Sequence, residues 1–392
     1  MPINAKNKRW AFLIVMSLLL GWGIVGWAHS SIPLTNDFIE YWSAGKLLLL
    51  GNDPYSAGQV LDMERGLGRS GAGPLIPFSP PWALTFMAPL ALVNPHLSRV
   101  LWLFTTIALV GACTEWSWRL YDGGNSVGPL KWLVAILFAP TLTVLIIGQA
   151  GPLILAALIS FLLLERERHD FLAGMLVMPA AIKPQLLYLF WIGLLVWACK
   201  YRRWAVPAGL GVALIISSAL ALAFDPAIFS QYFSLLRDPM LLDQPYPVLG
   251  GVLRLLFGVE KRWLQFVPAA FGLAWFVQYW RTCHRDWGWR EHLPLLLLVS
   301  LVTTPYGWFF DQVVLLPVVM QCTIWVVRRR GAVAAWAAVA FVATNLIALA
   351  FIAVGLTTFW YVWIAPVWLL FYLVLRHYVS KPPVPASSSE CC

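Results

Sequence analysis

The sequence predicts an all-α polytopic membrane protein, a bundle of roughly twelve transmembrane helices. Hydrophobic residues make up 60% of the chain, the mean hydropathy is +0.75 and only 11% of residues are charged, unlike soluble globular domains. The apolar residues form long continuous runs and not the alternating ten-residue strands of a β-barrel. The net charge of +9 comes from short clusters between these runs, which orient a membrane protein and give no indication of nucleic-acid binding.

The first predicted span covers residues 10–28. The segment before it carries Lys6, Lys8 and Arg9, which places it in the cytoplasm by the positive-inside rule. The apolar run is long and lacks a convincing cleavage site, so we interpret it as a retained helix and not as a signal peptide. Residues 29–76 then form a first outside loop.

This first outside loop is predicted to hold two short interfacial helices. Residues 36–50 have helical character with Asp37 and Tyr41 on one face, and the turn residues 51–54 end that helix. Residues 56–67 form a second, amphipathic segment that suits the membrane interface.

The remaining spans follow from apolar runs separated by basic or turn-forming segments. In order, these runs are residues 77–93, 100–118, 130–147, 150–164, 171–199, 204–223, 263–280, 293–307, 309–327, 331–355 and 358–375. A second outside loop covers residues 225–262. We therefore expect one integral membrane domain over residues 1–376 and a disordered cytoplasmic tail over residues 377–392.

Two topologies are open for the middle of the chain, and they differ in the side of the segment ERERHD at residues 165–170. If residues 130–147 cross the membrane, this segment falls outside. If residues 130–147 re-enter and return, it lies inside, and Gln149 and Lys183 face outward. We favour the second topology, because a lysine in mid-membrane is costly unless it faces a water-filled or anion-holding cavity.

Charged and polar side chains in or beside membrane spans are costly, which makes them candidates for function. Sorted by predicted side, they gather on the outer face: Asp37, Glu40, Asp53, Gln149, Lys183 and the turn 306–311. An active site should therefore open outward. The six cysteines lack the spacing of metal ligands or of a disulfide framework, so we predict no metal and no cofactor.

An ordered set of short motifs gives these candidates a common context. The motifs are Asn36-Asp37-Phe38, Tyr41-Trp42, Gly51-Asn52-Asp53-Pro54-Tyr55, Ser79-Pro80-Pro81, Gly148-Gln149, Lys183-Pro184 and Thr304-Pro305-Tyr306 before Asp311. From about residue 33 to 320 they resemble the GT-C superfamily, and more closely glycosyltransferase family 87, also described as domain of unknown function 2029. Polyprenyl-phosphate-mannose-dependent mannosyltransferases are among its members.

The resemblance implies a fold, an activity and a location. The fold is a GT-C-like helical bundle. The activity is the transfer of a hexose, with mannose as the family's example, from a polyprenyl-phosphate sugar to a lipid-linked or cell-envelope acceptor. The location is the bacterial cytoplasmic membrane, with both termini in the cytoplasm and the active site facing outward among membrane lipids.

The resemblance also implies roles for particular residues. Asp37 matches the position of a general base, which takes the proton of an acceptor hydroxyl while the sugar leaves its phosphate with inversion. A departing phosphate favours a nearby cation, for which Lys183 is the first candidate and Arg237 and Arg254 are competitors. The further candidates for substrate contact are Glu40, Tyr41, Tyr55, Gln149, Tyr306 and Asp311.

Each candidate also has a structural interpretation. Asp37 can cap the helix that follows it, and the tyrosines can anchor the chain at the membrane interface. Gln149 can satisfy a broken helix, and Lys183 can pair with a carbonyl. The family's commoner pattern has a histidine where this chain has Tyr306, which offers a hydroxyl in place of an imidazole.

A membrane transporter or lipid flippase is the alternative function. Transporters bind their substrate near the bilayer midplane between repeated halves of the chain. This sequence has no convincing internal repeat, and its candidate acids lie in a loop near the interface. These features favour the enzyme.

Overall fold

The computed structural model describes residues 37–71, 73–124, 128–238, 243–329, 331–356 and 358–380. Within these ranges the regular structure is entirely helical and contains no strand, so the predicted all-α class is confirmed. The predicted first span, residues 10–28, and Asn36 lie outside the described residues. The last helix continues to Ser380, four residues into the predicted tail.

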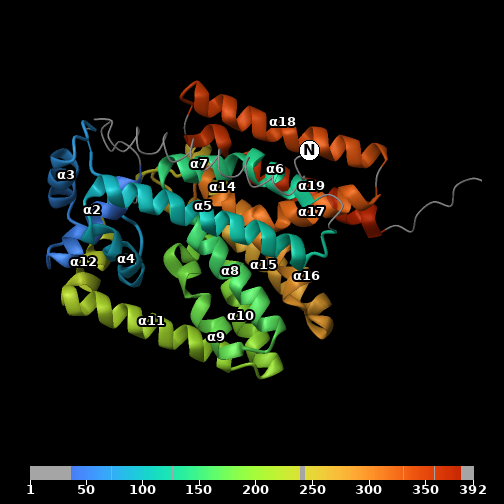
Figure 1. Cartoon of the computed structure of the whole chain (residues 1–392), viewed down its shortest axis with the longest axis horizontal. Coiled ribbons are helices and arrows are strands. Elements are labelled where there is room, and N and C mark those ends of the chain that lie inside the picture. Colours follow the sequence, from blue (N-terminus) through green and yellow to red (C-terminus); the bar gives the residue numbers. More distant parts are fainter. Residues whose placement is uncertain are drawn as a thin grey trace, which may run out of the picture. The chain divides into compact units, whose positions relative to one another are not determined.

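The chain divides into two compact units. The first unit draws on the chain up to Thr105 and on Leu220–Tyr232, and the second on Thr106–Ala219 and the chain from Phe233 onward. The first unit contains α2 (Phe38–Leu49), α3 (Ala57–Gly66), α4 (Pro81–Met87), the 3₁₀ helix η1 (Ala88–Leu92), the start of α5 (Pro95–Leu120), the end of α11 (Ala205–Phe224) and most of α12 (Ile228–Leu235). Figure 1 shows α2, α3 and α4 in blue.

Helix α2 is the centre of the first unit. It packs against α3, α4 and η1, and it has Gly45 where it meets α4, since a Cβ there would lie 2.7 Å from the carbonyl oxygen of Met87. The Trp42 indole donates a hydrogen bond to the carbonyl of Val93 at 3.1 Å. The helix ends before Gly51, whose φ of +68° suits a residue without a Cβ. The predicted turn after residue 50 is therefore present.

The predicted second span, residues 77–93, does not have the length of a span. Its helical part, α4 with η1, runs from Pro81 to Leu92, whereas a crossing helix needs about 20 residues. Prolines at positions 77, 80, 81 and 89 lack the amide hydrogen that a continuous helix requires.

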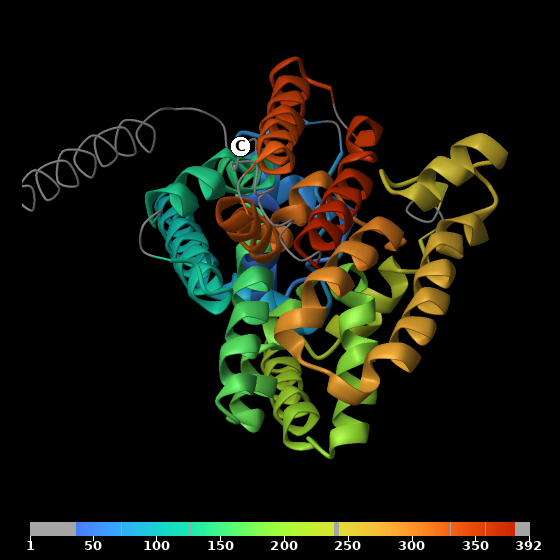
Figure 2. The same cartoon turned by 90° about the vertical axis from the view of Figure 1, so that its right-hand side faces the viewer.

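The second unit holds the remaining helices. They are α6 (Gly128–Leu137), α7 (Ala139–Ile147), α8 (Gly151–Arg166), α9 (Asp170–Leu176), η3 (Met178–Ile182), η4 (Pro184–Leu187), α10 (Tyr188–Tyr201), α14 (Leu249–Phe257), η5 (Arg262–Phe266), α15 (Val267–Cys283), η6 (His284–Asp286), α16 (Trp289–Thr303), η7 (Phe309–Leu315), α17 (Leu316–Arg329), α18 (Ala332–Ala353), η8 (Thr358–Tyr361) and α19 (Ile364–Ser380). Helices α10, α15 and α16 contact one another, and Figure 2 shows α15 and α16 in orange beside the green helices of this unit.

The long apolar helices differ in how much of their surface is covered. In η7–α17, Phe309–Arg329, 72% of the most apolar stretch is buried, against 22% in α11 and in α18. On these outer helices Ile215 is 69% exposed and Trp336 is 72% exposed. Such apolar faces are unfavourable in water and suit a lipid environment. The chain is therefore a membrane protein.

The number of spans is smaller by length alone than predicted. Among the described residues, five helices are long and apolar enough to cross a membrane, or six if the bent pair α6–α7 counts as one span. Several further helices of the second unit, such as α8 and α16, have 16 and 15 residues. Twelve spans stays a prediction.

One end of the second unit gathers arginine side chains. Arg290, at the start of α16, pairs with Asp122, which follows α5, and Arg328 of α17 donates to the Asp122 carbonyl at 2.5 Å. Arg290, and more weakly Arg328 and Arg166 at the end of α8, lower the pKa of the Asp122 carboxyl. The ends of α5, α8 and α17 therefore lie together, at what we call the arginine end.

The segment ERERHD belongs to the same end. Arg203, which follows α10, pairs with Asp170 and lies 3.5 Å from Glu165. Residues 165–170 and 200–203 thus lie together at the arginine end. The chain between them leaves this end and returns to it. Lys183, at the break between η3 and η4, lies where it turns back.

These contacts relate the ends of the middle helices to one another. The pair α6–α7 starts next to the end of α5, where Lys131 pairs with Glu115, and leads to α8, whose other end is the arginine end. Residues 130–147 therefore lead away from the arginine end and α8 leads back to it, while residues 165–170 stay with residues 200–203. Which of these segments cross the membrane, and in which direction, stays a prediction.

The break between α6 and α7 is held by a distant helix. The two helices are bent by 61° at Phe138. The amide hydrogen of Ala139, freed by this bend, donates to the side-chain carbonyl of Asn345 in α18 at 2.7 Å, and the Asn345 amide donates to Phe341 at 2.8 Å. A free amide in lipid is costly, so Asn345 stabilises the break.

We expect Asn345→Leu to lower the stability of the protein by about 1–2 kcal/mol, because the Ala139 amide loses its acceptor. Thermal unfolding in detergent micelles measures the effect. Leu346→Ala, at an exposed position of the same helix, is the control and should change the midpoint much less. Equal shifts in the two variants would contradict the role of Asn345.

Helices α9 and α11 touch through two glycines. A Cβ on Gly209 would overlap the carbonyl oxygen of Phe171, and a Cβ on Gly174 would overlap that of Val206. Small residues at such positions let helix backbones approach closely.

Gly209→Val is therefore expected to destabilise the protein by about 1–3 kcal/mol or more through overpacking. Gly211 lies two residues on in the same helix and has no atom within 4 Å of its Cβ position. Gly211→Val should leave the unfolding midpoint nearly unchanged. A similar loss in both variants would show that helix propensity, and not the α9–α11 contact, decides the outcome.

A candidate active site at three helix interruptions

Three interruptions of helices meet in the second unit. The first is Gly148-Gln149 between α7 and α8, where Gly148 has a φ of +79°. The second is Lys183, between η3 and η4. The third is the turn 304–308 between α16 and η7. Helix α8 packs against η3 and η7, and α7 packs against η7.

The side chain of Lys183 joins the three interruptions. Its Nζ atom lies 2.6 Å from Oδ1 of Asp311 and donates to Oε1 of Gln149 at 3.2 Å. The ammonium also lies 5.0 Å from the centre of the Phe310 ring, a cation–π contact. Its side chain is 12% exposed, so the charge is enclosed but still accessible.

Asp311 is fixed by the start of the helix that carries it. Its Oδ2 accepts a hydrogen bond from the backbone amide of Trp308 at 2.9 Å, which closes the first turn of η7. This leaves Oδ1 for Lys183. The side chain is 1% exposed, and a carboxylate buried to this degree requires a charged or hydrogen-bonding partner.

The turn 304–308 is held by hydrogen bonds on both sides. The Thr304 hydroxyl contacts the carbonyls of Gln185 and Tyr306, and Gln265 donates to the Pro305 carbonyl at 2.5 Å. The Tyr306 ring packs edge-on against Tyr246 at 4.4 Å. Tyr306 thus has a packing role in this turn.

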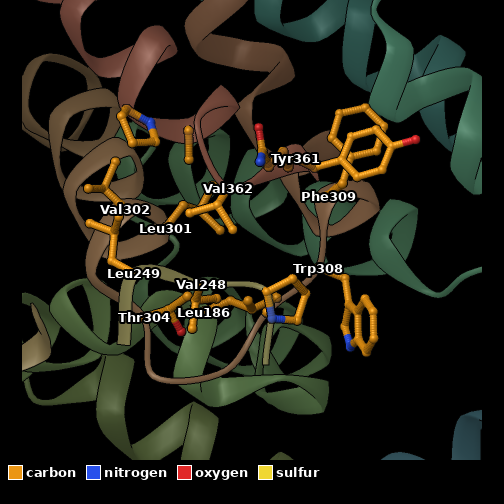
Figure 3. A pocket seen from close by; sticks show the side chains of 15 residues that line it. Leu186, Val248, Leu249, Leu301, Val302, Thr304, Trp308, Phe309, Tyr361 and Val362 are labelled. Atoms are coloured by element: carbon orange, nitrogen blue, oxygen red, sulfur yellow. The ribbon is translucent and has the colours of Figure 1, made fainter. Parts of the chain in front are cut away.

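A small cavity of about 30 Å³ lies beside the same turn. Its wall includes Thr304, Trp308, Phe309, Gln312 and Tyr361, and Figure 3 shows the Phe309 and Tyr361 rings next to each other. These two rings stack with centres 4.7 Å apart. The space holds about one water molecule.

The arrangement leaves one donor of Lys183 for a further ligand. An ammonium has three N–H donors, and Asp311 and Gln149 use two of them. The remaining donor suits one phosphate oxygen, while the Asp311 carboxylate balances the charge of Lys183 in an apolar surrounding.

The comparison with protein families decides the class. The sequence model of glycosyltransferase family 87 matches residues 79–305, more than half of the chain. The chain belongs to glycosyltransferase family 87. No significant match was found among curated proteins or among solved structures.

The family 87 match covers part of the candidate site. It includes Gln149 and Lys183 and ends at Pro305, before Asp311. It begins after α2, so the assignment of Asp37 does not rest on it. The predicted membership in the family is thus confirmed, and the roles of individual residues stay predictions.

Asp37 occupies the first position before α2 in this family 87 protein. Its side chain makes no capping hydrogen bond to the helix, so the structural interpretation as a cap is not supported. Asp37 and Glu40 are both half-buried. Tyr41 is buried in the core of the first unit, which favours packing over substrate contact.

Tyr55 has a structural position as well. Its hydroxyl donates to the carbonyl of Ser79 at 2.9 Å, and its ring lies 5.3 Å from that of Tyr232. Burial raises the pKa of Tyr55. These contacts argue against the predicted role of Tyr55 in substrate binding.

The two arginines that compete with Lys183 differ in exposure. Arg237 is exposed. Arg254 is buried, and its guanidinium donates to the carbonyls of Asp243, Gln244 and Val259 at 2.6–3.2 Å. These hydrogen bonds use the guanidinium to hold the surrounding loop in shape. They argue against the predicted phosphate contact.

We expect Arg254→Met to lower stability, because each carbonyl left without its donor costs about 1–3 kcal/mol. Arg262 offers a matched control, since its side chain is half exposed and pairs with Asp243 at 2.8 Å. Arg262→Met should change stability little. Loss of donor binding in a normally stable Arg254→Met protein would contradict the structural role.

Three contributions to the site were not foreseen. They are the Trp308 amide, the Phe310 ring and Asn345 behind the α6–α7 break. An isolated asparagine in an alanine-rich span is a usable signal, because a polar side chain in a membrane helix needs a partner. In the part of the chain that the structure describes, no group of three or more His, Cys, Asp and Glu side chains could hold a metal.

Proposed function

We propose that this protein transfers a hexose, with mannose as the first candidate, from a polyprenyl-phosphate sugar to a lipid-linked or cell-envelope acceptor. Membership in family 87 supports glycosyl transfer. The apolar outer helices support a lipid-linked substrate, because such a donor stays in the bilayer.

The observation that carries the proposal is the environment of Lys183. A lysine enclosed in a membrane protein is costly and is retained where a charge is needed. Here Asp311 and Gln149 hold its ammonium at the meeting point of three broken helices. This supports a site for the phosphate of the donor.

In the proposed reaction an acceptor hydroxyl attacks the anomeric carbon of the sugar. The new C–O bond forms as the bond to the phosphate oxygen breaks, which inverts the anomeric centre. Asp37 is the candidate base for the hydroxyl proton, and Lys183 is the candidate cation for the departing polyprenyl phosphate. A phosphate needs little protonation to leave, so one carboxylate suffices.

The arginine end supports an orientation. Arginine and lysine are enriched on the cytoplasmic side of membrane proteins, so Arg203, Arg290 and Arg328 favour the cytoplasm for that end. Gln149 then lies one helix, α8, away from it, on the outer side. We therefore propose that the active site faces outward and that both termini lie in the cytoplasm. The protein is proposed to cross the bacterial cytoplasmic membrane about twelve times.

The test uses purified protein in liposomes with polyprenyl-phosphate mannose labelled in the sugar and with glycolipids from cells that lack this protein. We expect a labelled glycolipid, and none from a nucleotide sugar. Polyprenyl-phosphate glucose in a parallel reaction tests the sugar. Movement of unmodified donor across the bilayer without transfer would support a flippase and contradict the proposal.

A further inference from the structure

Two Asp-Pro turns of the first unit face each other. One contains Asp53 and follows α2, and the other contains Asp225 and follows α11. A Cβ built on Gly51 would lie 3.4 Å from the carbonyl oxygen of Phe224. The rings of Tyr55 and Tyr232, just beyond the turns, are 5.3 Å apart.

The carboxylates of these turns form an acidic pair. The nearby charge of Asp225 and, more strongly, burial raise the pKa of Asp53. Among the described residues, no lysine or arginine contributes to that pKa, and neither aspartate takes part in an ion pair. Two like charges without a cation destabilise each other.

Asp225 has an unused oxygen. It is 5% exposed. Its Oδ1 accepts the amide hydrogen of Ala227 at 2.8 Å, while its Oδ2 is buried and has no hydrogen-bond partner in the described part of the chain. Leaving a buried carboxylate oxygen without a partner is costly.

The surrounding backbone adds negative potential. Helix α2 ends at Leu49 and α11 ends at Phe224, so both turns follow directly on the C-terminal end of a helix. That end carries a partial negative charge and favours cations. Two carboxylates and two helix C-termini therefore point to the same kind of ligand.

We propose that Asp53 and Asp225 bind a divalent, oxygen-seeking cation of the Mg²⁺, Mn²⁺ or Ca²⁺ class, which joins the turn after α2 to the turn after α11. The charge of such an ion matches the pair of carboxylates. Oxygen atoms are the ligands these ions prefer, and backbone carbonyls and water complete their coordination. The proposed site departs from the expectation, drawn from cysteine spacing, that the chain holds no metal.

The test measures binding of Mn²⁺ to the full chain, purified in detergent and stripped with a chelator, from the electron paramagnetic resonance signal of the free ion. We expect one bound Mn²⁺ per chain, displaced by Ca²⁺ or Mg²⁺. Even a residue that only hydrogen-bonds to a metal ligand contributes about tenfold or more to the affinity for the metal. Asp225 and Asp53 are proposed to bind the ion directly, so Asp225→Asn and Asp53→Asn should each weaken binding at least that much. Asp62→Asn, on an exposed face of α3, should bind as the native protein does.

Thermal unfolding gives a second readout that does not depend on sugar transfer. Without metal, Asp225→Asn should be at least as stable as the native chain, because one repelling charge is gone; with Mn²⁺, only the native chain and Asp62→Asn should gain stability. No binding by the native chain at millimolar Mn²⁺, or unchanged binding in both aspartate variants, would overturn the proposal. A stability that follows pH but not metal would also overturn it, by showing that the pair shares a proton.

Discussion

Replacing Asp37 by asparagine is expected to reduce sugar transfer by a factor of about 10²–10⁴, the usual contribution of a general base. Asparagine keeps the size of the side chain and removes its ability to take a proton. Asp37 makes no capping hydrogen bond to α2, so the start of the helix should tolerate the change. Initial rates with saturating polyprenyl-phosphate sugar measure the effect on the chemical step.

The control for this variant is Asp62→Asn, which removes the same charge from an exposed position in the same unit. It should retain the native rate and the native unfolding midpoint. If Asp37→Asn transferred sugar at the native rate, Asp37 would not be the base. Glu40, half-buried one turn further along α2, would then be the next residue to test.

Removing the charge of Lys183 is expected to abolish transfer and to destabilise the protein. Lys183→Met leaves the Asp311 carboxylate buried without its cation, and breaking a buried ion pair from one side costs about 3–5 kcal/mol. A loss of activity in this variant alone is therefore ambiguous, because unfolding also removes activity.

A second variant separates the two effects. In Lys183→Met with Asp311→Asn no unpaired charge remains, and the asparagine still accepts the Trp308 amide that Asp311 binds. We expect this double variant to recover most of the lost stability, since a buried ion pair can be replaced with little net loss. It should not recover transfer, because the phosphate still lacks its cation. Recovery of both would show that Lys183 is structural.

The residues of the second-unit site were predictable because each interrupts an apolar run. Gln149, Lys183 and Asp311 stand where a membrane span would otherwise continue, and polar groups in such places need partners. The sequence does not reveal that Gln149 and Asp311 are the partners of Lys183, since these residues are far apart along the chain and meet only through folding.

Two other candidate residues have structural hydrogen bonds that the sequence does not reveal. Tyr55 and Arg254 lie in predicted outer loops, where their residue types suit substrate binding. In the structure they turn inward and bind backbone carbonyls. A loop sequence shows which hydrogen-bond donors are present. It does not show whether these donors bind the backbone carbonyls of the loop or a substrate.

Hydropathy does not measure helix length. Residues 77–93 are apolar enough for a span, yet the helical part has twelve residues, from Pro81 to Leu92. If this segment does not cross the membrane, the direction predicted for α5 is reversed. Contacts such as Arg290 with Asp122 relate the end of α5 to the start of α16 independently of hydropathy.

The segment that matches the family model depends on residues outside it. Residues 79–305 carry Lys183, but its carboxylate partner Asp311 lies beyond that boundary, and so does Asn345, which closes the bend at Ala139. A fragment excised at those limits would contain Lys183 without its counter-ion. It would also contain the bent helix pair without the side chain that accepts its free amide hydrogen. A minimal enzyme, or a chimera between relatives, therefore needs η7 and α18 from the same parent as α7 and η3.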